Sequence, residues 1–402
     1  MTAGREAFSP YAWVVTAACF WMALLAWGTV FYGNTFFVPA LQMEHGWSAS
    51  TVSSAIALFF WLAIPVTLAF GWIADKFGTR LAVAYSGLAV GGGIAAMGQL
   101  SKPWQLYAAY ALIATGYPLM ATPAISASLV PWFGPKMGLP LSLALTGASV
   151  GGALSVPLMV NGSALYGFPT VAFAVGLLVA GTILPLGLFV LRRPSDAQKP
   201  PSAKVETSFT AKQALVTSRF WRIAIAGGLG LGAQVGYLSH QLAIGSDVAS
   251  VDYAAYAVSL GVACGAAGRL ITGYLSTRVP VKWLTVVTYL MQGLGIGVLS
   301  FANQPFDLYL GASIAGFFIG NIVMLPPLLL REAFGPAAYG KLYGFANIAF
   351  YTMAGIGSAL AGSLRDVTGA YTLALFTFVA FDLLAALILA LSPKHQSGNA
   401  SR

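Results

Sequence analysis

The stretch Gly71-Trp72-Ile73-Ala74-Asp75-Lys76-Phe77-Gly78-Thr79-Arg80 ends one long apolar run and leads into another. The first run covers residues 50–74 and the second covers 81–99. Each is long enough, at about 1.5 Å per helical residue, to cross a hydrocarbon core of about 30 Å. We therefore expect two membrane-spanning helices joined by a short polar loop.

Part of this stretch returns in the second half of the chain at a nearly constant offset. Gly71-Trp72-Ile73 corresponds to Gly273-Tyr274-Leu275, and Phe133-Gly134-Pro135 corresponds to Phe334-Gly335-Pro336. Agreement between separate segments indicates an internal duplication, which many transporter folds contain.

Apolar runs of the same kind recur along the whole chain. The composition agrees, because 58% of residues are hydrophobic and only 8% are charged, whereas soluble domains have about a quarter charged residues. The first run is too long for the apolar core of a signal peptide, so we expect an uncleaved span. The predicted fold class is an all-α membrane protein with twelve transmembrane helices in two pseudo-symmetric six-helix bundles. The predicted spans are 11–38, 50–74, 81–99, 104–131, 137–160, 168–191, 219–244, 252–276, 282–301, 306–330, 339–363 and 370–391.

A polar segment with three prolines and no apolar periodicity divides the chain nearly in half. We expect an N-terminal six-helix bundle at 1–191 and a cytoplasmic linker at 192–218. A C-terminal six-helix bundle with a short cytoplasmic tail is expected at 219–402.

The basic residues predict the orientation of the chain in the membrane. With the N-terminus in the cytoplasm, every Lys and Arg except Lys102, Arg269 and Arg365 falls on the cytoplasmic side. This follows the positive-inside rule, and an even number of spans places both termini in the cytoplasm. We expect a multi-pass cell-membrane protein, as in a bacterial inner membrane. The net charge of +9 is scattered among loops, so it does not indicate nucleic-acid binding.

In its glycine, aspartate and basic positions, the loop at 71–80 resembles the signature loop of the major facilitator superfamily. In that superfamily the loop joins helices on the cytoplasmic side and helps hold the two halves together. The resemblance therefore implies gating roles for Asp75 and Arg80. The second copy of the loop has Thr277 where the first has Asp75.

Within that superfamily, the whole chain is similar to the monocarboxylate porters and the related oxalate/formate exchangers. The similarity is carried by four short motifs: Tyr32-Gly33, Gly46-Trp47-Ser48, Pro123-Ala124 and Trp132-Phe133. Arg269 stands where that family has an arginine that holds a substrate carboxylate. The resemblance implies secondary active transport of small organic anions by alternating access, with proton symport expected first and anion exchange as the alternative.

The chain also departs from that family at three positions. Asn34 lies in the first span where some porters have a lysine, and Lys341 lies only at the end of span 11. Gly265 replaces the acid that animal members have one turn before the arginine. A second cationic anchor is therefore missing, and the coupling residues cannot be transferred.

Arg269 is the only basic residue near the middle of a predicted span. A charge near the membrane centre costs about 2.5–3.5 kcal/mol on insertion scales, so such a residue faces a cavity or a partner. A guanidinium matches a carboxylate in bidentate geometry. We predict that Arg269 binds substrate; a structural ion pair with an acid of the same half is the alternative.

Other polar and aromatic residues lie in the spans that line the cavity of the superfamily. Gln234, Tyr237 and Gln241 share one helical face. For each residue alone, hydrogen bonding between helices is the alternative role. Besides Arg269, the predicted substrate contacts are Tyr32, Asn34, Tyr117, Thr122, Gln234, Tyr237, His240, Gln241, Asn321, Asn347 and Tyr351.

Proton coupling needs a group that titrates between the two access states. His240 and Asp247 are the predicted candidates, and Asp252 lies nearby. The alternative is that both aspartates sit in the external loop. Asp382, inside span 12, is expected to be a hydrogen-bonded structural residue.

No metal or bound cofactor is expected, because Cys19 and Cys264 both lie inside apolar runs. Gly147-Ala148-Ser149-Val150-Gly151 matches the hydrolase pattern G-x-S-x-G, but it lies in an apolar run instead of a strand–turn–helix, so no enzyme activity is predicted. Glycines four apart, such as Gly316 and Gly320, allow helices to approach closely.

The leading alternative function is a multidrug or metabolite exporter of the same superfamily. Such exporters commonly bind cationic drugs, and an intramembrane arginine would repel a cation. The duplicated halves disfavour a receptor or a channel. The expected partners are a small organic anion, protons and the lipid bilayer, and the protein is expected to act as a monomer.

Overall fold

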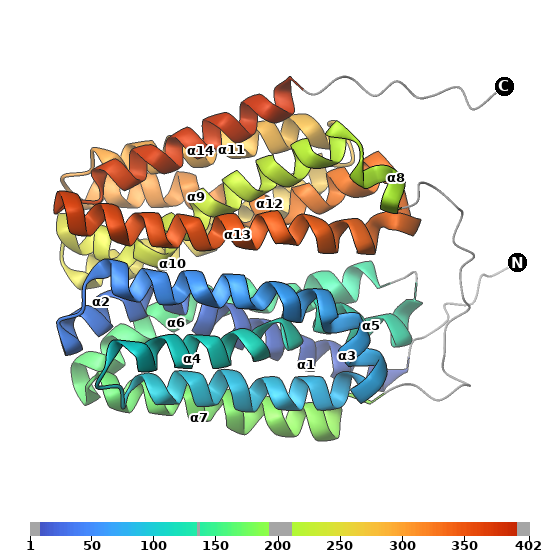
Figure 1. The fold of residues 1–402 in the computed structure, drawn as a ribbon, viewed down its shortest axis with the longest axis horizontal. Coiled ribbons are helices and arrows are strands. Elements are labelled where there is room, and N and C mark those ends of the chain that lie inside the picture. The colour runs from blue at the N-terminus through green and yellow to red at the C-terminus, as the bar shows by residue number, and fades with distance from the viewer. Residues whose placement is uncertain (1–8, 135–136, 193–210, 392–402) are drawn as a thin grey trace, which may run out of the picture.

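The computed structural model describes residues 9–134, 137–192 and 211–391. In these ranges all regular structure is helical, and the long helices run roughly side by side (Figure 1). The prolines of the predicted linker and the C-terminal tail lie outside the described residues.

The first half of the chain supplies six spans. The first consists of α1 (Pro10–Leu25), a π-helical segment η1 (Ala26–Phe31) and α2 (Gly33–His45). The others are formed by α3 (Ala49–Met97), which holds two spans, by α4 (Pro103–Gly116), η2 (Tyr117–Leu119) and α5 (Thr122–Phe133), by α6 (Gly138–Tyr166), and by α7 (Phe168–Pro185) with η4 (Leu186–Val190).

The second half begins with the short helix α8 (Ala211–Leu215) and supplies six more spans. These are α9 (Ser218–Val248), α10 (Val251–Leu275), α11 (Val281–Ser300), α12 (Pro305–Phe334), α13 (Pro336–Thr368) and α14 (Thr372–Ala390).

Ten described helices are long and apolar enough to cross a membrane, with α3 counted once. α3 holds two spans because Gly78, at φ 78° and ψ 152°, interrupts its helical geometry at the predicted loop. This left-handed conformation favours glycine because it has no Cβ. The remaining span, α9, is the seventh along the chain and is not among the ten, since Gln234, His240 and Gln241 lower its hydropathy.

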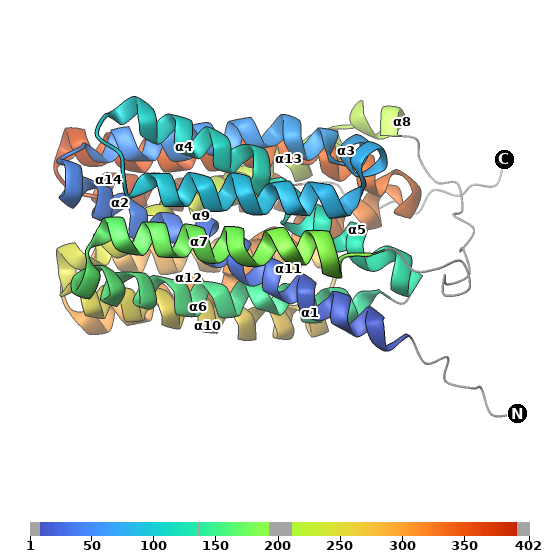
Figure 2. The same cartoon turned by 90° about the horizontal axis from the view of Figure 1, so that it is seen from below.

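The two halves lie against each other along the length of the molecule. In Figure 1 the first half, blue to green, is below the second half, yellow to red, and Figure 2 shows the same helices from below. Across the interface α3 packs on α13, α6 packs on α10, and α2 packs on α9. The fold is thus the predicted pair of six-helix bundles.

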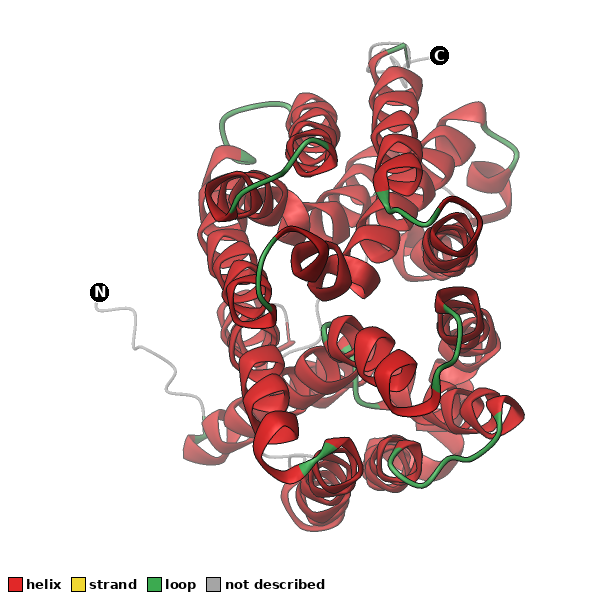
Figure 3. Cartoon of the chain, turned by 90° about the vertical axis from the view of Figure 1, so that its left-hand side faces the viewer, coloured by secondary structure: helices red, strands yellow, loops and turns green. Residues whose placement is uncertain are grey.

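Two ends of the molecule can be told apart. The linker end is where η4 stops at Val190 and α9 starts at Ser218. The distal end carries the loops from α2 to α3 and from α13 to α14, and it faces the viewer in Figure 3.

The G-x-S-x-G match lies inside helix α6, which explains its small residues. A Cβ atom at Gly147 would lie 2.1 Å from the Phe20 carbonyl oxygen, and one at Gly151 would lie 2.1 Å from that of Leu24. These glycines therefore allow α1 and α6 to pack backbone against backbone. The segment has none of the strand–turn–helix geometry that a hydrolase nucleophile needs.

Candidate functional site

Arg269 lies in α10, where this helix faces α6 and α12. Its Nη1 atom donates a hydrogen bond to Ser149 Oγ in α6, at 3.3 Å. On the other side the guanidinium meets Gly320, at the middle of α12. Among the described residues no carboxylate forms an ion pair with Arg269. The ion pair between Arg365 and Asp247 lies at the distal end of the molecule. The guanidinium is therefore partly buried with one hydroxyl as its acceptor.

Phenol groups from three other spans lie close to one another, and one of them reaches Arg269. The Tyr32 phenol is within electrostatic range of Arg269. The Tyr117 phenol is within range of those of Tyr32, Tyr343 and Tyr351. Tyr32, Tyr117 and Tyr351 belong to the predicted set, so the structure brings three of its members together, and Tyr32 connects this group to Arg269.

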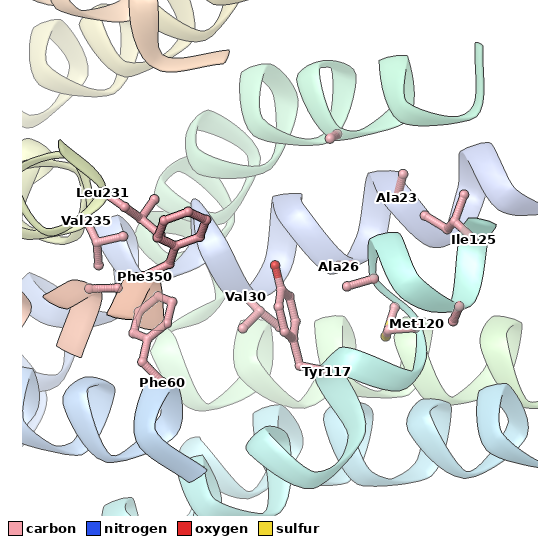
Figure 4. Packing of buried hydrophobic residues seen from close by; sticks show 14 of the residues in the cluster. Ala23, Ala26, Val30, Phe60, Tyr117, Met120, Ile125, Leu231, Val235 and Phe350 are labelled. Carbon is pink, nitrogen blue, oxygen red and sulfur yellow. The ribbon is translucent and has the colours of Figure 1, made fainter. Parts of the chain in front are cut away.

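Aromatic rings extend this cluster along both bundles. The ring centroids of Phe59 and Tyr117 are 5.3 Å apart, and those of Trp27 and Tyr117 are 6.2 Å apart. Phe60 of α3 meets Tyr351 of α13 at 5.9 Å, which crosses the interface between the bundles. Figure 4 shows Tyr117 and Phe60 in one buried cluster with Val30. The centre of the molecule thus combines one cation with phenol and aromatic surfaces.

Two of these tyrosines lie at breaks in helical geometry. Tyr32 directly follows the π-helical segment of the first span, and Tyr117 opens the 3-10 segment of the fourth. π-Segments are frequent at functional sites, because the irregular turn changes the direction of the following side chains. The breaks could not be read from the apolar periodicity of either span.

The predicted amides are buried, and each contacts a different neighbour. Asn34 Oδ1 accepts a hydrogen bond from the Tyr110 hydroxyl at 2.9 Å, and Asn321 Nδ2 donates to Thr272 Oγ1 at 2.8 Å. Asn347 Nδ2 donates to a carbonyl of its own helix, at Tyr343. The bonds of Asn34 and Asn321 join different helices, as in the alternative role, whereas that of Asn347 stays within its own helix. Asn321 is next to Gly320, which the Arg269 side chain meets.

The remaining predicted contacts are spread over α5 and α9. Thr122 is half-buried in the first turn of α5. Gln234, Tyr237 and Gln241 are buried in α9. Gln234 Oε1 has no hydrogen-bond partner within the described ranges, whereas the Tyr237 hydroxyl interacts with the Gln241 side chain one turn along the same helix. Unpaired polar atoms of this kind are costly in an apolar interior, so they mark a place where a ligand can supply the missing bond.

His240 lies toward the distal end and connects the two bundles. Its Nε2 atom is 2.8 Å from Ser53 Oγ of α3, and its Nδ1 atom is 3.0 Å from the Tyr371 hydroxyl. The ring is fully buried. The structure therefore places His240 in a contact between the halves, away from Arg269.

Asp247, the other predicted proton carrier, is at the distal end of α9. Its carboxylate accepts a salt bridge from Arg365 at 2.9 Å, and both side chains are partly exposed. Asp252 is exposed in the first turn of α10. The two aspartates thus occupy the distal surface, in the helix turns on either side of the loop from α9 to α10.

Asp366 was missed by the sequence analysis. It lies near the end of α13, and its carboxylate accepts hydrogen bonds from the backbone N–H groups of Ala49 and Ser50 at 3.0 and 2.8 Å. It therefore caps the N-terminus of α3 from the opposite bundle, where a negative charge is favoured. Nothing in the sequence connects residues so far apart.

Asp382 is hydrogen-bonded, as predicted. It is fully buried in α14, and Gln292 Nε2 lies 3.0 and 3.1 Å from its two carboxyl oxygens. Gln292 also donates to the Gly230 carbonyl at 3.2 Å. The cluster ties together α9, α11 and α14 inside the second bundle.

The predicted gating residues lie near the Gly78 break in the middle of α3, at the linker end of the molecule. Asp75 is exposed, and Arg80 donates to the Leu188 carbonyl of η4, in the same bundle. Lys76 lies 4.8 Å from the Trp72 ring centroid. The loop is thus packed on its own half in this conformation.

The sequence profile of the Major Facilitator Superfamily matches residues 16–358. This chain belongs to that superfamily. It is 26% identical over 376 residues to the oxalate:formate antiporter of Oxalobacter formigenes, an alignment that covers 89% of this chain and 87% of that protein. It is 27% identical over 405 residues to monocarboxylate transporter 13 of Bos taurus, with 95% of this chain and 89% of that protein covered.

Solved structures of the superfamily share the fold at low identity. A variant of the nucleoside transporter NupG superposes with a TM-score of 0.76 at 12% identity, covering 94% of this chain and 99% of that one. A bacterial homologue of the human lysosomal transporter Spinster, inward-facing and occupied, gives 0.74 at 16% identity, covering 96% and 97%. This chain is therefore a multi-pass membrane transporter of the major facilitator fold.

Proposed function

We propose that this superfamily member is a secondary active transporter of small organic anions, with monocarboxylates as the expected class. The observation that carries the proposal is the Arg269 guanidinium, which has no carboxylate partner among the described residues and lies within range of the Tyr32 phenol. A carboxylate bound there would neutralise a charge that is costly in the membrane. The names of the two relatives described above agree with this class of substrate.

The tyrosines near Arg269 are the proposed orienting groups. Tyr32, Tyr117 and Tyr351 can donate hydrogen bonds to a bound anion, while Phe60 and Trp27 offer apolar surface to its body. The amides, Thr122, and the polar face of α9 complete the proposed lining.

Movement between the two access states would follow from this charge. Without substrate, an uncompensated arginine disfavours closure around it; with a carboxylate bound, the pair is neutral and the halves can rock about the site. We propose an inward-facing arrangement here, since the bonds of Asp366 and His240 hold the bundles together at the distal end. Asp75 and Arg80 are proposed to act in gating at the linker end.

Anion exchange is the second candidate, and one observation favours it. Proton symport needs a titratable group that compensates Arg269 when the substrate leaves, and no described acid faces that residue. His240 and Asp247 remain the proposed carriers if protons are coupled. In an exchanger, the returning anion supplies the compensation instead.

The orientation and setting remain those expected from the sequence. We propose a monomer in a bacterial inner membrane with both termini in the cytoplasm, divided into bundles at 1–191 and 219–402 by the linker at 192–218. The distal end is then the outer face.

The test is uptake by proteoliposomes of radiolabelled formate, oxalate, lactate and benzoate. Each is measured with empty vesicles, with vesicles preloaded with unlabelled anion, and with an imposed pH gradient. Stimulation by preloading indicates exchange, and stimulation by the gradient indicates symport.

Two variants accompany the parent protein. Arg269→Gln should abolish carboxylate uptake, while the control Arg278→Gln should retain it, because Arg278 lies after the end of α10 and stacks on Tyr274 at 4.5 Å. If no carboxylate is transported, or if Arg269→Gln transports as well as the parent, the proposal is wrong.

A further inference from the structure

Helix α12 presents a glycine at the point where the Arg269 side chain meets it. A Cβ atom at Gly320 would lie 2.6 Å from Arg269 Nε, 3.0 Å from Nη2 and 3.2 Å from Cζ. Because Cζ is the farthest of the three, the Nε–Nη2 edge of the guanidinium is directed at the glycine, and its flat face is not. A side chain at position 320 would occupy space that this edge now fills.

Other glycines between α10 and α12 have a different role. A Cβ atom at Gly316 would lie 2.3 Å from the Gly261 carbonyl oxygen, and one at Gly268 would lie 1.7 Å from that of Phe317. At those positions the small residue allows backbone to meet backbone. At Gly320 the nearest atoms belong to the end of a long side chain, so the missing Cβ makes room for Arg269 and not for the partner helix.

Ser149 meets the opposite corner of the guanidinium from the first bundle. The Nη1 atom, farthest from the Nε–Nη2 edge, donates to Ser149 Oγ at 3.3 Å. This is longer than the usual N–H···O distance of about 2.9 Å. A hydroxyl held so loosely can be displaced by a carboxylate, which forms a shorter, charge-assisted bond.

We propose that Gly320 and Ser149 are positioning residues for Arg269. Gly320 forms a notch in α12 that receives one edge of the guanidinium, so that Nη1 points across to α6. Ser149 holds this corner while the site is empty and yields it to the substrate carboxylate. The inference rests on the proposed role of Arg269 as the anion anchor.

The notch should decide substrate affinity without deciding stability. In Gly320→Ala the added methyl meets a flexible side chain, which can move, so the fold tolerates the change while the guanidinium is displaced. A misplacement of about 1 Å can cost up to about 100-fold in activity, and loss of ground-state binding appears in KM. We therefore expect KM for the best carboxylate of the panel to rise about tenfold, with kcat within about twofold of the parent value.

The matched control is Gly297→Ala in α11. A Cβ atom there would meet only Val379 Cγ2, at 3.9 Å, which is an ordinary contact. Its KM and thermal unfolding midpoint should equal those of the parent. Gly320→Ala should share that midpoint and differ in KM.

A double-mutant cycle with Arg269→Lys separates positioning from packing. Lysine has no Nε–Nη2 edge, so Gly320→Ala should change the KM of the Arg269→Lys protein by less than about twofold. An equal increase in both backgrounds would mean that the glycine acts through helix packing, and the inference would be overturned.

Ser149 gives an independent arm of the test. Ser149→Ala should raise KM by about twofold to threefold, because Arg269 loses a group that positions it. Ser149→Thr keeps the hydroxyl, so its KM should stay near the parent value. If Arg269→Gln abolishes uptake but the Gly320 and Ser149 variants keep the parent KM, the positioning inference fails and the proposed function stands. If Arg269→Gln itself transports normally, the proposed function fails.

Discussion

Asp366 offers the sharpest test of how the two bundles are held together at the distal end. Its carboxylate accepts hydrogen bonds from the backbone N–H groups of Ala49 and Ser50, so Asp366→Ala removes both bonds, while the Ser48 side chain still caps α3. These bonds cross between the bundles and exist only while the distal end is closed. Their loss should therefore shift the conformational equilibrium toward distal opening.

The size of the shift follows from the geometry. A hydrogen bond to a charged group contributes about 1.5–3 kcal/mol when it is shielded from solvent. Asp366 is solvent-exposed, so screening reduces the joint effect to about 1–1.5 kcal/mol. Since about 1.4 kcal/mol is a factor of ten, the distal-open population should rise relative to the closed one by about fivefold to tenfold.

The assay is pulsed electron paramagnetic resonance with one nitroxide on each bundle. Met43 in α2 and Phe306 in α12 are exposed distal positions for the labels, with side-chain exposures of 85% and 67%. The native Cys19 and Cys264 are first replaced by serine. The distance between the two labels should be shorter in the distal-closed state and longer in the distal-open state. The fraction of molecules with the longer distance should grow in Asp366→Ala.

The control is Asp307→Ala. Asp307 is another distal aspartate, in the first turn of α12. Within the described ranges it accepts hydrogen bonds from Asn303 and Gln304 of its own bundle, at 3.3 and 3.4 Å. Its removal should leave the distance distribution unchanged. If Asp366→Ala behaves like this control, the cap does not hold the bundles closed and the reasoning is refuted.

Three further changes probe the packing and the buried polar clusters. Gly151→Ala should lower the thermal unfolding midpoint, because a Cβ atom 2.1 Å from the α1 backbone overpacks the interface at a cost of about 1–3 kcal/mol; an unchanged midpoint in a scanning assay would contradict the close α1–α6 contact. Gln292→Leu should destabilise the protein by about 1–3 kcal/mol, since it leaves Asp382 buried without its donor, and the added Asp382→Leu change should restore part of the lost midpoint. Ser53→Ala removes one hydrogen bond to His240, so it should shift the equilibrium toward distal opening by about 1 kcal/mol in the same resonance assay, which is less than the shift in Asp366→Ala. An equal or larger shift would show that the His240 bond holds the bundles together more strongly than the Asp366 bonds do.

Much of the fold could be predicted because lipid constrains the sequence strongly. A span must satisfy its backbone internally and expose apolar side chains, so its helix can be recognised from the run itself. The predicted boundaries at 219–244 and 252–276 therefore lie close to α9, at Ser218–Val248, and α10, at Val251–Leu275. The π-segment before Tyr32 was not foreseen, because a local change of hydrogen-bond register leaves hydropathy unchanged.

The candidate site was accessible from sequence only where a residue conflicts with its surroundings. Arg269 is conspicuous because a charge inside an apolar run is costly. Asp366 is not, since an aspartate near a loop is ordinary until its partners are known. Ser149 and Gly320 are small residues in apolar helices, where helix packing is their common role.

The sequence by itself determined that this protein spans the membrane, that short motifs recur in its two halves, and that Arg269 is a charge inside an apolar run. Each of these is local or additive along the chain, since apolar length, repeat offset and charge can be read one segment at a time. Only the tertiary structure decided which residues meet Arg269, and that Asp366 caps a helix 317 positions away in the chain. Such contacts depend on how helices from two bundles are rotated and stacked, and no single segment carries that information.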